Sequence, residues 1–295
     1  MIDFSNLEIR KKAYGGANGS KLSVIYNGNL YMLKLPVHAT KNPNLSYTNS
    51  CTSEFIGCHI FNMLGVKAQE TLLGKFDYHG KTRLVVACKD FTTPGTTILD
   101  FASVKNQIID SASNGYGMEL KDILDTIQNQ NVINPTLLEE HFWNMFVIDA
   151  LIGNWDRHNG NWGFLYNQEK DSLEIAPIYD CGSSLFPQID DESIKKALTF
   201  KNEMNARVYD LPTSALLIDG KRVNYFKLIT SLDYKGCNEA IQRIVPQINL
   251  DEINQFIDSV EQLSHLQKEF LKKILQLRKE IILDTAFKAL TAKSR

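Results

Sequence analysis

Three polar residues in the middle of the chain have the types and spacing that phosphoryl transfer requires. Asp156 begins the segment Asp-Arg-His-Asn-Gly-Asn, Asn161 ends it, and Asp180 lies further on in Ile-Tyr-Asp-Cys-Gly. In phosphoryl-transfer enzymes a loop Asp orients the substrate hydroxyl, while an Asn and a second Asp hold Mg²⁺ on the nucleotide phosphates. Mg²⁺ prefers oxygen ligands and binds through one or two carboxylates together with those phosphates. The three residues therefore predict a site for Mg²⁺ and a nucleotide, although Asp and Asn also favour turns.

Two further polar residues, Arg157 and His158, lie inside the same loop. An Asp-x-His pattern can ligate a catalytic metal, but no second histidine-rich cluster in the sequence supports a metal hydrolase. We therefore expect both side chains to shape the loop or to add positive charge near the phosphates. On that basis His158 is included among the predicted catalytic residues.

A glycine-rich segment near the amino terminus could hold the phosphates. Residues 14–21 read Tyr-Gly-Gly-Ala-Asn-Gly-Ser-Lys and separate two strand-like runs. The motif is weak by itself, because it matches neither the Gly-x-Gly-x-x-Gly pattern nor the Walker pattern. The residues expected to contact the nucleotide here are Gly16, Ala17, Asn18, Gly19 and Ser20.

A lysine in the next strand could also contact the nucleotide. Runs 21–26 and 30–35 flank Asn-Gly-Asn at 27–29, which predicts a tight hairpin. Lys34 lies in the second, mostly apolar run, where a cation costs free energy unless a partner compensates its charge. A nucleotide phosphate and Glu54 of the next predicted helix are two such partners. The alternative is a lysine that reaches solvent from a strand edge.

Residues 1–91 are predicted to form a small, mostly β lobe with one helix. Apolar residues at helical spacing predict that helix over about 47–64. Short strands are expected at about 67–73 and 82–88, with turn residues at 77–80 between them.

Residues 85–91 lie where a kinase chain passes from one lobe to the other. We therefore expect Ala87, Cys88 and Lys89 to contact the nucleotide. The Thr-Pro-Gly sequence that follows places the lobe boundary near residue 91.

Residues 92–295 are predicted to form a larger, mainly helical lobe. Asn134 followed by Pro135 is a favourable helix start, and apolar residues on all sides of 137–152 predict a buried helix that ends just before the Asp156 loop. Segments 162–166 and 173–178 predict a hairpin that brings Asn161 and Asp180 to one end. Helical periodicity over 250–283 predicts helices that close the lobe.

Composition excludes several classes of protein. A net charge of −2 argues against a nucleic-acid partner, and five cysteines without a Cys-x-x-Cys motif predict free, packed thiols. No apolar run approaches the roughly 20 residues that span a bilayer, and the amino terminus lacks the features of a signal peptide. We expect a soluble protein without an integral membrane segment, either cytoplasmic or exported without a Sec-type signal.

At these residues the chain resembles the HipA-like bacterial serine/threonine kinases, whose fold is related to that of phosphoinositide 3- and 4-kinases. The resemblance is carried by residues 16–21, 32–35, 53–55, 151–161 and 177–180. It implies an α+β, two-lobed protein-kinase-like fold with a small β-rich N-lobe and a larger helical C-lobe. It also implies that Asp156 is catalytic, that Asn161 and Asp180 bind Mg²⁺, and that Lys34 and the supporting Glu54 belong to the ATP site.

HipA toxins carry a region before the glycine segment that helps to dock an antitoxin. Here the glycines begin at Gly15, so we expect no antitoxin-docking N-terminal region. We predict an ATP- and Mg²⁺-dependent kinase that acts on Ser or Thr of a protein substrate and also on itself. A phosphoinositide kinase is the first alternative, disfavoured because no basic or amphipathic segment adjoins the site. A catalytically inactive nucleotide-binding interaction module is the second, disfavoured because the polar residues of the site are all present.

Overall fold

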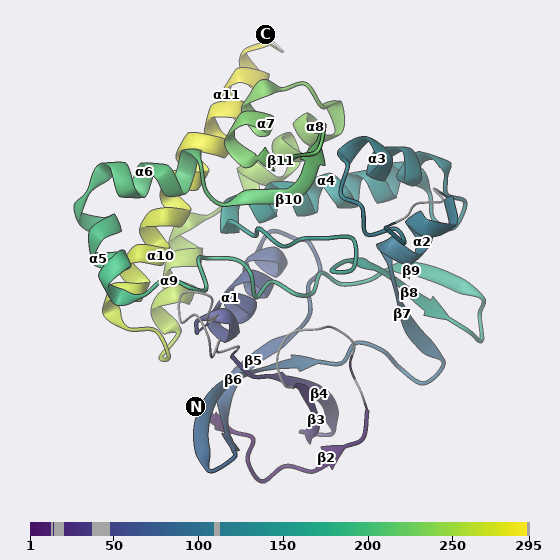
Figure 1. Cartoon of the computed structure of the whole chain (residues 1–295), viewed down its shortest axis with the longest axis vertical. Coiled ribbons are helices and arrows are strands. Elements are labelled where there is room, and N and C mark those ends of the chain that lie inside the picture. Colours follow the sequence, from purple (N-terminus) through teal and green to yellow (C-terminus); the bar gives the residue numbers. More distant parts are fainter. Residues whose placement is uncertain (13, 15–20, 37–47, 109–112, 294–295) are drawn as a thin grey trace.

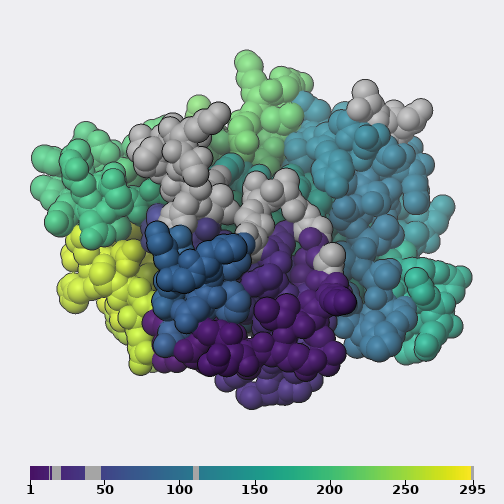
Figure 2. All heavy atoms as spheres, turned by 60° about the horizontal axis from the view of Figure 1, so that its bottom comes forward, coloured from purple at the N-terminus to yellow at the C-terminus, as the bar shows by residue number. Residues whose placement is uncertain are grey.

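The computed structural model describes residues 1–12, 14, 21–36, 48–108 and 113–293. A β-rich N-terminal lobe and a helical C-terminal lobe make up the molecule, as predicted (Figure 1). In Figure 2 the N-terminal lobe (purple and blue) lies in front, and segments of the C-terminal lobe extend past it on both sides. The predicted nucleotide contacts Gly16, Ala17, Asn18, Gly19 and Ser20 lie outside the described residues.

One six-stranded sheet forms the N-terminal lobe, in the order β1-β5-β6-β4-β3-β2. Its neighbouring strands are antiparallel except for the parallel pair β1 and β5. The strands are β1 Ile2–Asp3, β2 Ile9–Arg10, β3 Lys21–Tyr26, β4 Asn29–Lys34, β5 Thr71–Tyr78 and β6 Lys81–Lys89. The predicted hairpin joins β3 to β4, and its turn residues Asn27 and Gly28 have φ of 47° and 74°, as a type I′ turn requires.

The second hairpin of this lobe is longer than predicted. The strand expected at 67–73 begins only at Thr71, because the preceding residues contact the other lobe: Gln69 N donates to the carbonyl of Ile178 at 2.8 Å. The turn is confined to His79 and Gly80, since the β5–β6 ladder continues to the pair of Tyr78 with Lys81.

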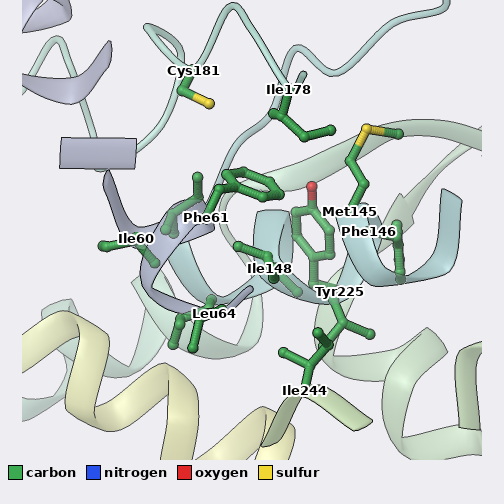
Figure 3. Close-up of a cluster of buried hydrophobic side chains, with 14 of the residues drawn as sticks. Ile60, Phe61, Leu64, Met145, Phe146, Ile148, Ile178, Cys181, Tyr225 and Ile244 are labelled. Atoms are coloured by element: carbon green, nitrogen blue, oxygen red, sulfur yellow. The ribbon is translucent and has the colours of Figure 1, made fainter. Parts of the chain in front are cut away.

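Helix α1 (Ser50–Met63) lies between the sheet and the C-terminal lobe (Figure 1). Its buried residues Ile60 and Phe61 belong to the large core of the C-terminal lobe, and Figure 3 shows them beside Ile148, Ile178 and Cys181. A smaller, separate cluster of buried hydrophobic side chains packs against the N-terminal sheet. The division at residue 91 stays a prediction, and the core does not follow it, because α1 packs with the helical lobe.

Helix α4 (Pro135–Ile152) is the buried centre of the C-terminal lobe. Asn134 caps it as predicted, with its side-chain oxygen accepting hydrogen bonds from Thr136 N at 2.9 Å and Leu137 N at 3.3 Å. Gly153, with φ of 64°, ends it because a left-handed residue stops the helical hydrogen-bond pattern. A buried helix with two defined ends holds the Asp156 loop in a fixed place.

The predicted hairpin after this loop is present as β8 (Gly163–Asn167) and β9 (Ser172–Ile175). Strand β7 (Thr96–Asp100), which the sequence did not predict, pairs with β8 and makes a three-stranded sheet. The remaining elements of the lobe are α2 Phe101–Ile108, α3 Leu120–Asn129, α5 Asp191–Thr199, α6 Lys201–Tyr209, β10 Thr213–Ile218, β11 Lys221–Asn224, α7 Tyr225–Ser231, α8 Lys235–Ile244, η2 Val245–Gln247, α9 Leu250–Ser259, α10 His265–Arg278, η3 Lys279–Leu283 and α11 Asp284–Lys293. The helices predicted over 250–283 are therefore present.

All five cysteines are free and buried, as predicted. Among the described residues, no helix has the length and apolar character needed to cross a bilayer.

Candidate active site

Ion pairs join the two lobes at Lys34. The Lys34 Nζ atom lies 3.1 Å from Oε2 of Glu54 and 3.0 Å from Oδ1 of Asp180. Strand β4, helix α1 and the segment after β9 therefore meet at one cation. The predicted pairing of Lys34 with Glu54 is present, and its direct pairing with Asp180 was not predicted.

The alternation of β4 explains why Lys34 can reach these carboxylates. Tyr31 and Leu33 point into the apolar cluster of the sheet, so Met32 and Lys34 lie on the opposite face. Glu54 is only 1% exposed on α1, whereas Lys34 is 18% exposed. Because a buried carboxylate is costly without a partner, Lys34 compensates the charge of Glu54.

The charges of this group alter one another's pKa values. Burial disfavours the charged form of Lys34, but the carboxylates of Asp180 and Glu54 outweigh burial and raise the pKa of Lys34 above its usual value. The positive charge of Lys34 in turn lowers the pKa of Asp180. Lys34 is therefore a cation and Asp180 an anion at neutral pH.

Hydrogen bonds within the loop after α4 fix the position of Asp156. Asn154 accepts a hydrogen bond from Asp156 N at 3.1 Å, and the Asn161 side chain donates to the Asp156 carbonyl at 2.9 Å. Two predicted site residues, Asp156 and Asn161, are thus joined directly. The loop therefore closes on itself, with the Asn161 side chain against the Asp156 backbone.

Arg157 is a buried structural residue of this loop. It is 5% exposed and forms an ion pair with Asp149 of α4, with Nε 2.9 Å from Oδ2. Its Nη1 also donates to the carbonyl oxygens of Asn161, at 2.9 Å, and Tyr179. Arg157 therefore ties the Asp156 loop to the segment that carries Asp180, which is the loop-shaping role of the two that the sequence left open.

The sequence analysis missed Asp149, the partner of Arg157. A single acidic residue inside an otherwise apolar helix is the signal that could have identified it, because a buried charge requires a partner. Asp149 also accepts a hydrogen bond from the Asn154 side chain at 3.0 Å.

His158 contributes to the shape of the loop. Its Nδ1 accepts a hydrogen bond from Gly160 N at 3.0 Å, and its ring packs edge-on against Tyr116 with centroids 6.2 Å apart. Burial is the main cause that raises the pKa of the neighbouring Asp156.

Asp156 and Asp180 lie close enough for their charges to interact, since the negative charge of Asp180 adds to the raised pKa of Asp156. Asn161 donates through its amide nitrogen, which leaves its amide oxygen as an acceptor. Within the described residues, acidic, His and Cys side chains form no three-membered metal cluster. The Asp180 carboxylate and the Asn161 amide oxygen are ligands that suit Mg²⁺, which shares its coordination sphere with phosphates and water.

The predicted contacts on β6 alternate between the two faces of the sheet. Cys88 pairs with Met32 and shares the face that carries the ion pairs. Ala87 pairs with Leu33 and points into the sheet cluster instead. The side chain of Ala87 therefore faces away from the site, because adjacent strand residues point in opposite directions.

Lys89 ends β6 and has its backbone groups already in use. Its N–H donates to the carbonyl of Glu70 at 2.8 Å, and its carbonyl accepts from the side chain of Gln69 at 2.9 Å. A nucleotide contact at Lys89 stays a prediction.

Asp90, directly after β6, is a further residue that the sequence analysis missed. One of its carboxylate oxygens accepts from Lys12 Nζ at 2.5 Å and from Tyr14 Oη at 2.7 Å. Its other oxygen accepts from Thr92 N at 2.9 Å. Lys12 and Tyr14, at the start of the glycine-rich segment, are thus attached to the end of β6.

Comparisons with known proteins agree with this geometry. A family model described as HipA-like C-terminal domain matches residues 13–261. The chain is 47% identical to "Serine/threonine-protein kinase CtkA" of Helicobacter pylori over 287 residues, covering 97% of this chain and 87% of the relative.

Solved structures also match the chain. The crystal structure of a Helicobacter pylori proinflammatory kinase CtkA matches with a TM-score of 0.93 and 46% identity, over 100% of this chain and 99% of that chain. HipA in a toxin–antitoxin complex with HipB and operator DNA, from Shewanella oneidensis MR-1, matches with a TM-score of 0.58 and 15% identity, over 97% of this chain and 70% of that chain. The second likeness concerns the fold alone. Together they confirm the predicted two-lobed, α+β kinase-like fold.

Proposed function

The chain belongs to the HipA-like C-terminal domain family and is a kinase, and we propose that it transfers the γ-phosphoryl group of ATP to protein Ser or Thr with Mg²⁺. Its own Ser or Thr residues are included among the acceptors. The observation that carries this proposal is the pairing of Lys34 with both Glu54 and Asp180. A cation from the sheet, a helix Glu and a second Asp are the parts that position and neutralise nucleotide phosphates in kinases.

Each polar residue has a distinct role in this proposal. Asp156 orients the acceptor hydroxyl and takes its proton, while Asn161 and Asp180 would hold Mg²⁺, which neutralises the phosphate charge when bound. Lys34 turns from Asp180 to the phosphates and keeps Glu54 as its second partner. Phosphoryl transfer needs little covalent participation by the protein, so positioning and charge neutralisation account for the rate of transfer.

Arg157 and His158 support these roles through the loop. Arg157 holds the carbonyls of Asn161 and Tyr179, so the two proposed metal ligands keep a fixed separation. We propose no direct contact of Arg157 with the nucleotide. The division into lobes at residue 91, and the place of the protein in the cell, remain predictions.

Phosphoinositide kinase activity is the competing enzyme function. The test incubates purified protein with γ-labelled ATP and Mg²⁺, in separate reactions with a generic protein or with phosphatidylinositol vesicles. We expect label on Ser or Thr of the added protein and of the chain itself, and none on lipid. Label on lipid alone would favour the competing function, and nucleotide binding without transfer would indicate an inactive module.

An Asp156→Asn variant is the matched control for this assay. The amide keeps the size of the side chain but cannot accept the proton, so transfer should fall by about 10²–10⁴ while ATP binding is retained. A collapse of ATP affinity instead would show that Asp156 binds ligand or supports the fold.

A further inference from the structure

A hairpin and a helix far along the chain contact the backbone just before Asp156. Arg222 on β11 donates from Nη2 to the carbonyl of Trp155 at 2.5 Å. Tyr225, the first residue of α7, donates from its hydroxyl to the carbonyl of Asn154 at 2.5 Å. Carbonyls beyond a helix end have no partner within the helix, and here two consecutive ones are bound by side chains from a separate element.

The guanidinium of Arg222 is itself held in place. Its Nε lies 3.1 Å from Oγ1 of Thr213 and 3.1 Å from the carbonyl of Ser214, both on β10. The β10–β11 register shifts between Thr213 and Leu217, and such irregularities re-aim side chains in sheets. The planar, multi-donor guanidinium can bond β10 and the loop at the same time, which an ammonium group cannot do in the same way.

Tyr225 and Arg222 differ in how they can be tested. Tyr225 is 1% exposed, and its ring packs 5.2 Å from that of Phe146; Figure 3 shows it standing among the core side chains of α4. Arg222 is exposed, so its replacement leaves the core intact. Arg222 is therefore the residue through which the contact can be probed.

We propose that Arg222 is a positioning residue for phosphoryl transfer, which fixes the Asn154–Trp155 backbone from the β10–β11 hairpin and thereby aims Asp156. The inference rests on the proposed function for the role of Asp156. The hydrogen bonds from Arg222 to β10 and to the Trp155 carbonyl, here called the clamp, are a structural property. It requires no contact between Arg222 and ATP. A shift of about 1 Å in a catalytic group can reduce rate about 10²-fold, so loss of the clamp should act on turnover.

The experiment compares Arg222→Gln, Arg222→Lys and the control Lys221→Gln, the neighbouring exposed residue of the same hairpin. For each variant the thermal midpoint, the ATP dissociation constant, KM and kcat are measured. Arg222→Gln should lower kcat about 10–100-fold, with the ATP dissociation constant and thermal midpoint unchanged. Arg222→Lys should recover part of the loss, and Lys221→Gln should behave as wild type.

Hydrogen–deuterium exchange of a peptide covering residues 153–161 gives a readout that needs no activity. Arg222→Gln should raise exchange there, and Lys221→Gln should not. Wild-type exchange in Arg222→Gln would overturn the clamp, even if the protein proved to have no kinase activity. Normal kcat in Arg222→Gln would overturn its positioning role. If Arg222→Gln and Arg222→Lys lost kcat to the same extent and the thermal midpoint fell in both, the role of Arg222 would be merely structural.

Discussion

At the scale of single residues, Lys34 stands between two carboxylates with different surroundings. Glu54 is buried on α1, whereas the side chain of Asp180 is 43% exposed. Asp180 can therefore exchange its partner for a cation from solution, while Glu54 has no such access. Replacement of Asp180 and replacement of Glu54 should therefore have different effects on ATP binding and turnover.

Replacing Lys34 by Ala should weaken ATP binding and reduce turnover, because a cation facing several phosphate charges is lost. Glu54→Gln should reduce turnover more than ATP affinity, since Glu54 acts by aiming Lys34. Residues that act as one unit give non-additive losses, so the double variant should be little worse than Lys34→Ala. ATP affinity and kcat of all three variants provide the measurement.

Asp3→Asn is the control for this cycle, because Asp3 on β1 forms an exposed ion pair with Lys75 on β5 at 3.0 Å, in the same sheet as Lys34. Its replacement should leave both ATP affinity and kcat unchanged. Fully additive losses for Lys34 and Glu54 would mean that Glu54 does not act through Lys34.

The sequence predicted the pairing of Lys34 with Glu54 because a charge inside an apolar strand requires a partner. It could not predict the direct contact of Lys34 with Asp180, which depends on how the lobes pack. Ala87 was assigned to the site by its position in the chain alone. Whether a strand residue faces the site depends on the register, and a single-residue change in register reverses the faces.

At the scale of elements, α4 and its loop form a unit that Asp149 and Arg157 hold together. Asn134 and Pro135 mark the start of α4 clearly enough for its prediction from sequence. The predicted start of β5 was wrong, because the backbone groups of Lys67 and Gln69 bond to Ile178 of the other lobe. Local pattern cannot distinguish such a cross-lobe contact from a strand in the sheet.

Asp149→Ala should destabilise the protein by about 3–5 kcal/mol, because the buried Arg157 would lose the only carboxylate that contacts it among the described residues. The free energy of unfolding from urea titration measures this cost. The control is Asp125→Ala, which removes an exposed ion pair with Lys121 and should cost at most about 0.5 kcal/mol. Equal costs for the two variants would contradict a structural role for the buried pair.

At the scale of the whole molecule, burial of a titratable side chain links stability to pH. The Nε2 atom of His141 on α4 is buried without a hydrogen-bond partner among the described residues. Burial, together with the nearby charge of Arg157, lowers the pKa of His141 to about 4. The unfolded chain, with a His pKa of about 6.5, therefore binds this proton more readily than the folded one.

Stability should consequently fall as the pH drops below about 6.5 toward 4. From pH 7 to pH 5 the contribution of His141 amounts to about 1–2 kcal/mol of unfolding free energy. Urea titrations of wild type and His141→Asn at both pH values isolate it, because other titrating groups are common to the two proteins. An identical loss in both proteins would show that His141 does not titrate in this way.

The central claim is that Asp180 holds Mg²⁺ for phosphoryl transfer from ATP to Ser or Thr. Asp180 has φ of 60°, a conformation that Asn also tolerates, so Asp180→Asn removes the charge without straining the backbone. Asp171→Asn is the matched control, because Asp171 also has a positive φ of 45° but lies in the turn between β8 and β9.

The measurement is Mg²⁺-dependent transfer from γ-labelled ATP to protein Ser or Thr, with the thermal midpoint recorded on the same samples. Wild type and Asp171→Asn should transfer label, and folded Asp180→Asn should lose Mg²⁺-dependent transfer. Near-normal transfer by folded Asp180→Asn would contradict the account.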